Sequence, residues 1–156
     1  MKKNILVLAA HPDDETLGCG GTIAKLIKSQ KYNASVVFFT DGVSSRSNKN
    51  KKKIKERRLN CKSACNLIGF NKIKFNNFPD NKLDTLPLIK LVNLIEKELI
   101  KLRPDIIFTH HEGDLNIDHQ LVSRATFTAT RNYNKKKYMI LTYEVLSSTD
   151  LNYGRN

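Results

Sequence analysis

The chain has 156 residues, a formal net charge of +12 and 40% hydrophobic residues, which is typical of one soluble globular domain. No apolar run approaches the roughly 20 residues of a transmembrane helix, which excludes a membrane span. The apolar run after Lys2 and Lys3 is shorter than the core of a signal peptide, about 7–15 residues, and no cleavage-type sequence follows it. We therefore expect a cytoplasmic protein with a single domain over residues 1–156.

Short apolar runs alternate with amphipathic stretches along the chain, which predicts an α/β protein. Strands are expected over residues 5–10, 34–39, 72–75, 105–109 and 138–145. Helices are expected over residues 18–30, 51–68, 88–102 and 119–131, and Gly69 is a suitable residue to end the second of them. Residues 42–50 and 78–86 are expected to be loops. This order predicts a doubly wound, Rossmann-like, mostly parallel sheet with helices on both faces.

The first predicted strand ends in four ionisable side chains within five residues, from His11 to Glu15, and Pro12 stiffens the turn. Open α/β sheets place ligand sites at the carboxyl ends of their strands. Histidine and aspartate are metal ligands, and a second carboxylate beside them can act as a base. Helix capping would explain Asp13 or Asp14 alone, but not both together with His11. We therefore interpret this turn as part of a functional site.

All four histidines follow strands that end at the same edge of the predicted sheet. His11 follows the first strand, and His110, His111 and His119 follow the fourth. If these two strands are neighbours, where the winding of the sheet reverses, His11 and His119 face each other across the crevice. Two histidines and one carboxylate, with one position left for water, are typical of a catalytic zinc site.

Three cysteines are an odd number, and their positions lack zinc-finger spacing. Cys61 and Cys65 lie one helical turn apart on the second predicted helix, and Cys19 lies at the start of the first. We interpret Cys61 and Cys65 as small packing residues, and we expect none of the three cysteines to be a metal ligand.

The excess of positive charge suggests nucleic acid or an anionic membrane surface as a partner. Eight basic residues lie between positions 42 and 58, against the single acidic Glu56. No aromatic residues for base stacking are interleaved with them, and a solvated helix face explains most of the lysines. We expect no specific nucleic-acid binding, whereas an anionic small molecule, such as a sugar nucleotide or a phospholipid-linked sugar, agrees with the charge.

Two segments resemble the signatures of a known family. Residues 11–15, His-Pro-Asp-Asp-Glu, followed by Gly-Cys-Gly-Gly-Thr at 18–22, are similar to the first motif of the LmbE-like, or PIG-L, zinc-dependent N-deacetylases. Residues 113–119, Gly-Asp-Leu-Asn-Ile-Asp-His, resemble the second motif. Shorter matches follow the family's order at Thr40-Asp41-Gly42, Arg57, Phe78-Pro79-Asp80 and Tyr143-Glu144-Val145.

The resemblance implies a hydrolase that removes the N-acetyl group from an N-acetylglucosamine-type sugar, either free, lipid-linked or nucleotide-linked. It implies that His11, Asp14 and His119 hold Zn²⁺, and that Asp13 is the general base for a zinc-activated water molecule. Fe²⁺, Co²⁺ or Mn²⁺ could replace zinc at such a site. It further implies that Arg57 holds an anionic or hydroxyl-rich part of the substrate.

Asp41 or Asp80 is expected to bind a sugar hydroxyl. Many members of the family have a histidine three residues before the last metal ligand, where it helps to stabilise the oxyanion. This chain has Asn116 there. Either Asn116 assists the oxyanion through a hydrogen bond, or His110 or His111 replaces the missing histidine in this role, and both are expected to bind substrate.

Members usually continue with another strand and helix beyond the position where this sequence stops. We therefore expect the family's last strand and helix to be absent and the fifth strand to be an unprotected edge. The alternative function is a non-catalytic metal- or nucleotide-binding Rossmann-like module, whose glycine-rich turn holds a phosphate at a helix N-terminus. That alternative gives His11 and Asp14 no role. The sequence leaves the oligomeric state open.

Overall fold

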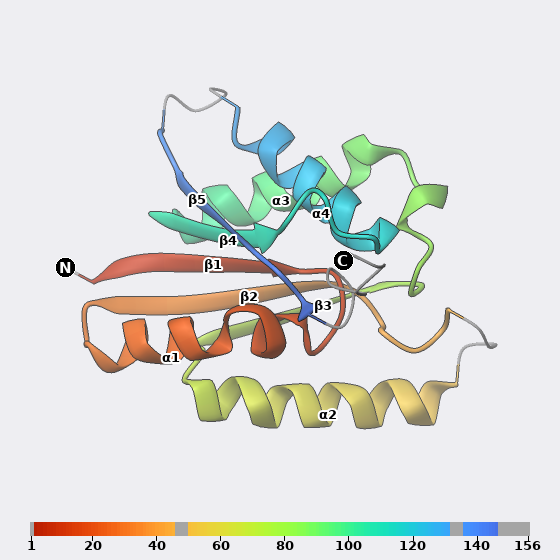
Figure 1. Cartoon of the computed structure of the whole chain (residues 1–156), viewed down its shortest axis with the longest axis horizontal. Coiled ribbons are helices and arrows are strands. Elements are labelled where there is room, and N and C mark those ends of the chain that lie inside the picture. The colour runs from red at the N-terminus through yellow and green to blue at the C-terminus, as the bar shows by residue number, and fades with distance from the viewer. Residues whose placement is uncertain (1, 46–49, 132–135, 147–156) are drawn as a thin grey trace, which may run out of the picture.

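The computed structural model describes residues 2–45, 50–131 and 136–146. Five parallel strands, β1 (Lys3–Ala9), β2 (Tyr32–Thr40), β3 (Lys72–Phe78), β4 (Ile106–His110) and β5 (Met139–Tyr143), form one sheet in the order β3-β2-β1-β4-β5 (Figure 1). β1 pairs with both β2 and β4, so the winding reverses at β1. The predicted α/β class and the predicted neighbourhood of the first and fourth strands are confirmed.

Helices cover both faces of the sheet (Figure 1). The helices α1 (Gly20–Lys28) and α2 (Lys51–Ile68) pack on one face, and α3 (Leu88–Leu102) and α4 (Ile117–Ala129) on the other. Successive residues of β1 point to opposite faces, so Ile5 and Val7 pack in the first apolar cluster and Leu6 and Leu8 in the second. This double burial explains why the first strand is apolar throughout.

The structure refines several predicted boundaries. The first helix begins at a π-helical turn, Glu15–Cys19, ahead of α1, and a short 3₁₀ helix, Leu83–Thr85, lies in the predicted 78–86 loop. The last helix begins two residues earlier than predicted, because the side chain of Asn116 caps its first turn. α2 ends at Gly69, which has a left-handed φ of 101°, as predicted.

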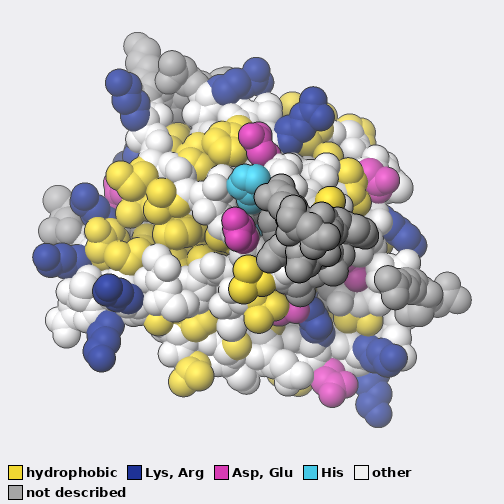
Figure 2. Space-filling view, viewed as in Figure 1, with side chains coloured by type: hydrophobic (Ala, Val, Ile, Leu, Met, Phe, Trp, Pro, Cys, Tyr) yellow, Lys and Arg dark blue, Asp and Glu magenta, His cyan; other side chains and the backbone are white. Residues whose placement is uncertain are grey.

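The fifth strand is shorter than predicted and lies at an edge of the sheet. Met139 and Leu141 on this strand are exposed, and Figure 2 shows hydrophobic side chains gathered on the same side of the molecule. Tyr143 packs against Gly18, where an added Cβ would lie 2.3 Å from the tyrosine ring. Within the described ranges, no helix combines the length and the apolar character needed to cross a bilayer.

Candidate metal centre

Three predicted ligands converge at the carboxyl ends of β1 and β4. Only Ala10 separates His11 from the end of β1, and Asp14 lies in the turn that follows. His119 lies in the first turn of α4. The distance between His11 Nδ1 and His119 Nε2 is 3.1 Å. Asp14 Oδ2 lies 3.2 Å from His11 Nδ1 and 3.3 Å from His119 Nε2. One ring nitrogen of each histidine and one carboxylate oxygen therefore face the same point.

This geometry agrees with the size of a divalent metal ion. Bond lengths of about 2.0–2.2 Å around a tetrahedral ion place neighbouring ligand atoms about 3.3–3.5 Å apart, close to the three distances between these side chains. Asp14 also accepts a hydrogen bond from the backbone N–H of His11 at 2.7 Å, which fixes the turn. The Asp14 side chain does not cap the helix that follows, so the capping interpretation fails for this residue.

The other ring nitrogens of the two histidines contact buried carboxylates. His119 Nδ1 lies 2.8 Å from Asp114 Oδ2. His11 Nε2 lies 3.0 Å from Asp80 Oδ1 and 3.2 Å from Asp118 Oδ2. Such carboxylates hold the tautomer and orientation of metal-binding histidines in many proteins. The two histidines are therefore oriented by carboxylates in the way that is typical of metal-binding histidines.

The carboxylates make this region favourable for positive charge. Burial lowers the pKa of His11, but hydrogen bonds to Asp118, Asp14 and Asp80 outweigh it and raise the pKa to about 12. Burial alone would raise the pKa of Asp14, but hydrogen bonds with His11 and His119 hold this pKa well below its usual range. A carboxylate that stays ionised among histidines is the state that a cation requires.

Asp13 lies beside the three converging side chains and has a different environment. Its side chain is 43% exposed and pairs with Arg57, whose Nη2 lies 2.6 Å from Asp13 Oδ2. Arg57 also donates from Nε to the carbonyl oxygen of Pro12 at 2.9 Å. Burial and the charge of Asp14 raise the pKa of Asp13, although Arg57 opposes them. A raised pKa favours proton transfer near neutral pH.

The backbone of Asp13 is strained. Its φ is 149°, a value rarely adopted by residues other than glycine, which typically costs about 1–3 kcal/mol. Hydrogen bonds on both sides hold this conformation, because Glu15 Oε2 accepts from the N–H of Asp13 at 3.0 Å and Arg57 binds its side chain. The fold thus maintains an unfavourable conformation at the residue predicted to be the base.

An open cavity of about 170 Å³ lies over this cluster. Seven of the predicted site residues line it: His11, Asp13, Asp14, Arg57, Asp80, Asn116 and His119. Asp80 was expected to bind a sugar hydroxyl, but its Oδ1 already contacts His11, so its main contact is with a candidate ligand.

Three predicted substrate-binding residues lie outside this lining. His110 is completely buried behind the cluster, where its ring stacks on that of His119 at 3.9 Å between centroids. His111 is exposed, and its Nδ1 accepts from the N–H of Gly113 at 3.1 Å. Asp41 is buried and bonds Ser44 through both carboxylate oxygens. His110 and Asp41 are therefore buried, whereas His111 is exposed, and the substrate-binding roles of all three stay predictions.

The environment of His110 identifies its tautomer. Its Nε2 accepts from the N–H of Ala10 at 2.9 Å, which places the ring proton on Nδ1. Burial lowers the pKa of His110 to about 3, so the ring stays neutral. His110 therefore packs behind His119 and binds the backbone of β1, and this accounts for its presence without a role in proton transfer.

Asn116 has two distinct polar groups. Its Oδ1 accepts from the backbone N–H groups of Asp118 at 2.9 Å and His119 at 3.4 Å, so the oxygen caps α4. Because the oxygen is committed, the amide NH₂ is the group that can donate to a molecule in the cavity. The Asn116 side chain thus stabilises the first turn of α4, which carries His119, and its amide group lies at the cavity as a hydrogen-bond donor.

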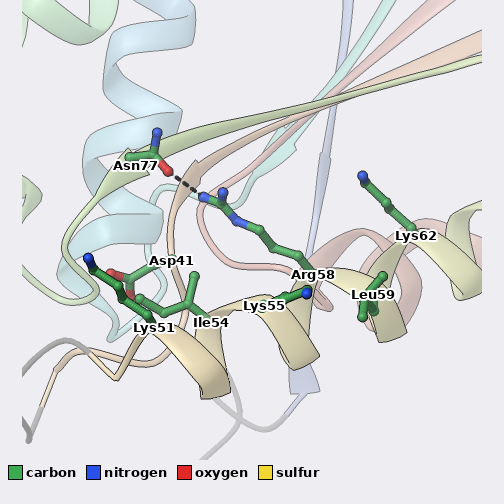
Figure 3. Close-up of a pocket in the computed structure, with 8 residues that line it drawn as sticks. All are labelled: Asp41, Lys51, Ile54, Lys55, Arg58, Leu59, Lys62 and Asn77. Carbon is green, nitrogen blue, oxygen red and sulfur yellow. Dashed lines mark hydrogen bonds between the residues drawn. The ribbon is translucent and has the colours of Figure 1, made fainter.

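A second, larger groove of about 510 Å³ lies between α2 and the carboxyl ends of β2 and β3. Figure 3 shows Lys51, Lys55, Arg58 and Lys62 along it, with Arg58 reaching Asn77. The groove adjoins the cavity through consecutive residues, because Asp41 lines the groove and Gly42 lines the cavity. Its basic lining faces the same edge of the sheet as the candidate metal centre.

The predicted basic stretch is only partly described. Residues 46–49, which include Arg46 and Lys49, lie outside the described residues. On the face in Figure 2, Lys and Arg side chains are spread around the rim rather than gathered in one patch. The expectation of no specific nucleic-acid binding stays a prediction.

Sequence reasoning gave no role to Asp114 and Asp118, although both belong to the second motif. Both are fully buried, and Asp118 also accepts from the backbone N–H groups of Asn81 and Leu83 at 2.8 and 3.0 Å. The sequence feature that could have identified them is the presence of two aspartates close to His119 in a short polar segment. The position of Asp118 depends on how the 80–83 loop packs against α4, and the sequence does not reveal this packing.

Residues 6–130 match the family described as PIG-L: GlcNAc-PI de-N-acetylase. The chain belongs to the PIG-L family. The predicted resemblance is therefore confirmed. The PIG-L match includes His11, Asp13, Asp14, Asn116 and His119.

Curated relatives of this PIG-L chain are deacetylases. It is 31% identical to the uncharacterized deacetylase YaiS of Escherichia coli over 94% of its own length and 76% of the relative. It is 27% identical to a probable N-acetyl-α-D-glucosaminyl L-malate deacetylase 2 of Bacillus cereus, over 90% of its own length and 67% of the relative.

Solved structures share the PIG-L fold described above. The conserved protein TT1542 from Thermus thermophilus matches 90% of the chain with a TM-score of 0.73 and 27% identity. The N,N′-diacetylchitobiose deacetylase from Pyrococcus horikoshii matches 90% with a TM-score of 0.75 and 23% identity, which shows the fold alone. The chain spans 65% and 60% of those two proteins, so it lies below two thirds of their length.

Proposed function

We propose that the protein is a metal-dependent hydrolase that removes the N-acetyl group from an N-acetylglucosamine-type sugar conjugate. The observation that carries the proposal is the convergence of His11, Asp14 and His119 on one point, with Asp13 beside them and a cavity above. Membership of the PIG-L family and the deacetylase relatives support the reaction type.

His11 Nδ1, Asp14 Oδ2 and His119 Nε2 would hold the metal ion. Zinc suits two imidazoles and a carboxylate, and Fe²⁺, Co²⁺ or Mn²⁺ are alternatives for the same donors. When bound, the ion supplies Lewis acidity to the amide carbonyl and lowers the pKa of a water molecule there. Asp114, Asp118 and Asp80 orient the two histidines for this role.

The remaining chemistry belongs to side chains of the chain itself. Asp13 accepts a proton from the attacking water and returns it to the amine that leaves, which its raised pKa favours. Arg57 keeps the Asp13 carboxylate in one orientation. The Asn116 amide donates a hydrogen bond to the oxygen that develops negative charge.

The basic groove along α2 supports a conjugate with an anionic part. Lys55 and Lys62 lie on the groove face with Arg58, one or two helical turns apart. Lys55→Gln should raise KM for an anionic conjugate by about 2–5-fold, as expected for a solvent-screened charge worth up to about 1 kcal/mol, and should leave KM for a neutral N-acetyl sugar unchanged. Lys101→Gln, on the exposed face of α3, is the matched control.

Metal analysis and a deacetylation assay on N-acetylglucosamine conjugates test the proposal. We expect a divalent ion at the candidate centre and release of acetate with a free amine on the sugar. A protein that binds metal at this centre but hydrolyses no N-acetyl sugar would instead favour a non-catalytic module. Nucleotide binding in the absence of metal would favour the phosphate-binding alternative.

A further inference from the structure

A second group of potential ligands lies on the other side of the His11–Glu15 turn. Cys61 and Cys65 point from α2 toward Glu15, and all three side chains are buried. Both sulfurs approach the same carboxylate oxygen, because Glu15 Oε1 lies 3.7 Å from Cys61 Sγ and 3.5 Å from Cys65 Sγ. The two sulfurs are 3.9 Å apart. Three ligand atoms therefore form a nearly equilateral triangle.

The size of this triangle matches a metal site with two sulfurs and one oxygen. For a tetrahedral zinc ion, bond lengths of about 2.3 Å to sulfur and about 2.1 Å to oxygen give sulfur–sulfur edges of about 3.8 Å and sulfur–oxygen edges of about 3.6 Å. Each of the three distances agrees with these edges. Thiolate ligands select zinc-like, thiophilic ions over Mg²⁺ or Ca²⁺.

Glu15 is also a buried carboxylate that lacks a cationic partner. Its side chain belongs to no ion pair within the described residues, and its hydrogen bonds come from Thr16, Cys61, Cys65 and the Asp13 N–H. A buried carboxylate is costly unless it is protonated or paired with positive charge. A cation between the three side chains would supply that charge.

Cys19 shows that burial of cysteine in this core does not by itself create such a group. It is buried in the same apolar cluster, but its Sγ contacts the backbone oxygen of Glu15 at 3.4 Å rather than the carboxylate. The shared carboxylate oxygen is thus particular to the pair on α2, and Cys19 provides a matched control.

We propose that Glu15, Cys61 and Cys65 form a second metal site, which takes a thiophilic divalent cation such as Zn²⁺. Binding releases the two thiol protons, and the two thiolates and the carboxylate then bind the ion with a net charge of about −1 for the whole group. All three side chains are buried, so we assign the site a structural role. It braces the catalytic turn, because the second oxygen of Glu15 holds the N–H of the strained Asp13.

Titration of the metal-free, reduced full chain with Cd²⁺ tests this site directly. Thiolate-to-metal charge transfer produces an ultraviolet absorption band that the His11–Asp14–His119 centre, which has no sulfur, does not give. We expect the band in the wild type, in Cys19→Ser and in His119→Ala, and its loss in Cys61→Ser and in Cys65→Ser. Because His119→Ala keeps the band, the result does not depend on the proposed function.

A measurement on the wild type covers the case in which a cysteine variant does not fold. Cd²⁺ should slow the alkylation of Cys61 and Cys65, read by mass spectrometry, and leave the alkylation of Cys19 unchanged. Absence of the charge-transfer band in the folded wild type at saturating Cd²⁺ would overturn the proposal. So would a band that survives in the folded Cys61→Ser or Cys65→Ser variant, or equal protection of all three cysteines.

Discussion

Two three-residue clusters flank the turn from His11 to Glu15, and they differ in what surrounds them. The His11–Asp14–His119 cluster lies under a cavity, and buried carboxylates contact the outer nitrogens of its histidines. In the Glu15–Cys61–Cys65 cluster, the two cysteines are buried in the apolar cluster on the α2 side of the sheet, and Glu15 accepts hydrogen bonds from Thr16 and from the N–H of Asp13. Open access and oriented imidazoles suit catalysis, whereas enclosure and thiols suit a structural role.

The two clusters are joined by adjacent residues of one turn. Asp14 belongs to the first and Glu15 to the second, and Glu15 accepts a hydrogen bond from the N–H of Asp13. A short run of acidic residues can thus serve separate tasks, because successive side chains leave the backbone in different directions. Variants of each cluster should therefore have separable effects on catalysis and on stability.

The largest effect is expected from His119→Ala. Removing a ligand should empty the open centre and lower kcat/KM by about 10³-fold or more, since the metal contributes several kcal/mol to transition-state stabilisation. Metal content measured beside activity checks this. Wild-type metal content at this centre in the variant would show that His119 is not a ligand.

A smaller effect is expected from Asn116, which borders only the open cluster. Asn116→Ser keeps an oxygen to cap α4 but removes the amide donor, so kcat should fall by about 10–10³-fold while the melting temperature changes little. Asn116→Ala removes the cap as well and should lower the free energy of unfolding by about 1 kcal/mol. If activity in the serine variant equals that of the wild type, the donor role is wrong.

A still smaller effect is expected from Asp114→Asn, which changes the residue that contacts His119 Nδ1. The affinity of the open centre for its metal should fall by about 10–100-fold, as is typical for carboxylates behind a metal-binding histidine. Competition with a chelator measures the shift. Thr16→Val is the matched control, because Thr16 donates to Glu15 in the closed cluster and should leave this affinity unchanged.

The sequence predicted the parallel sheet and the meeting of His11 with His119, because strand periodicity and strand order determine which residues reach one edge. It also placed His110 among the groups facing a substrate, which stays a prediction, although His110 is fully buried behind His119. Alternation does not reveal this position, because every residue of β4 is buried.

Other features depend on packing that no local pattern encodes. The pairing of Asp118 with His11 depends on how the 80–83 loop meets α4, because Asn81 and Leu83 donate to Asp118. The meeting of Glu15 with Cys65 depends on the rotation of α2 about its own axis. Cys61 and Cys65 one turn apart are compatible with either packing or ligation until that rotation is known.

The central claim is that Asp13 acts as the base beside a metal held by its neighbours. Asp13→Asn keeps the size of the side chain and leaves His11, Asp14 and His119 unchanged. We predict that this variant binds metal with the stoichiometry of the wild type but deacetylates an N-acetylglucosamine conjugate about 10²–10⁴-fold more slowly. Near-normal turnover by a metal-loaded Asp13→Asn protein would contradict the account.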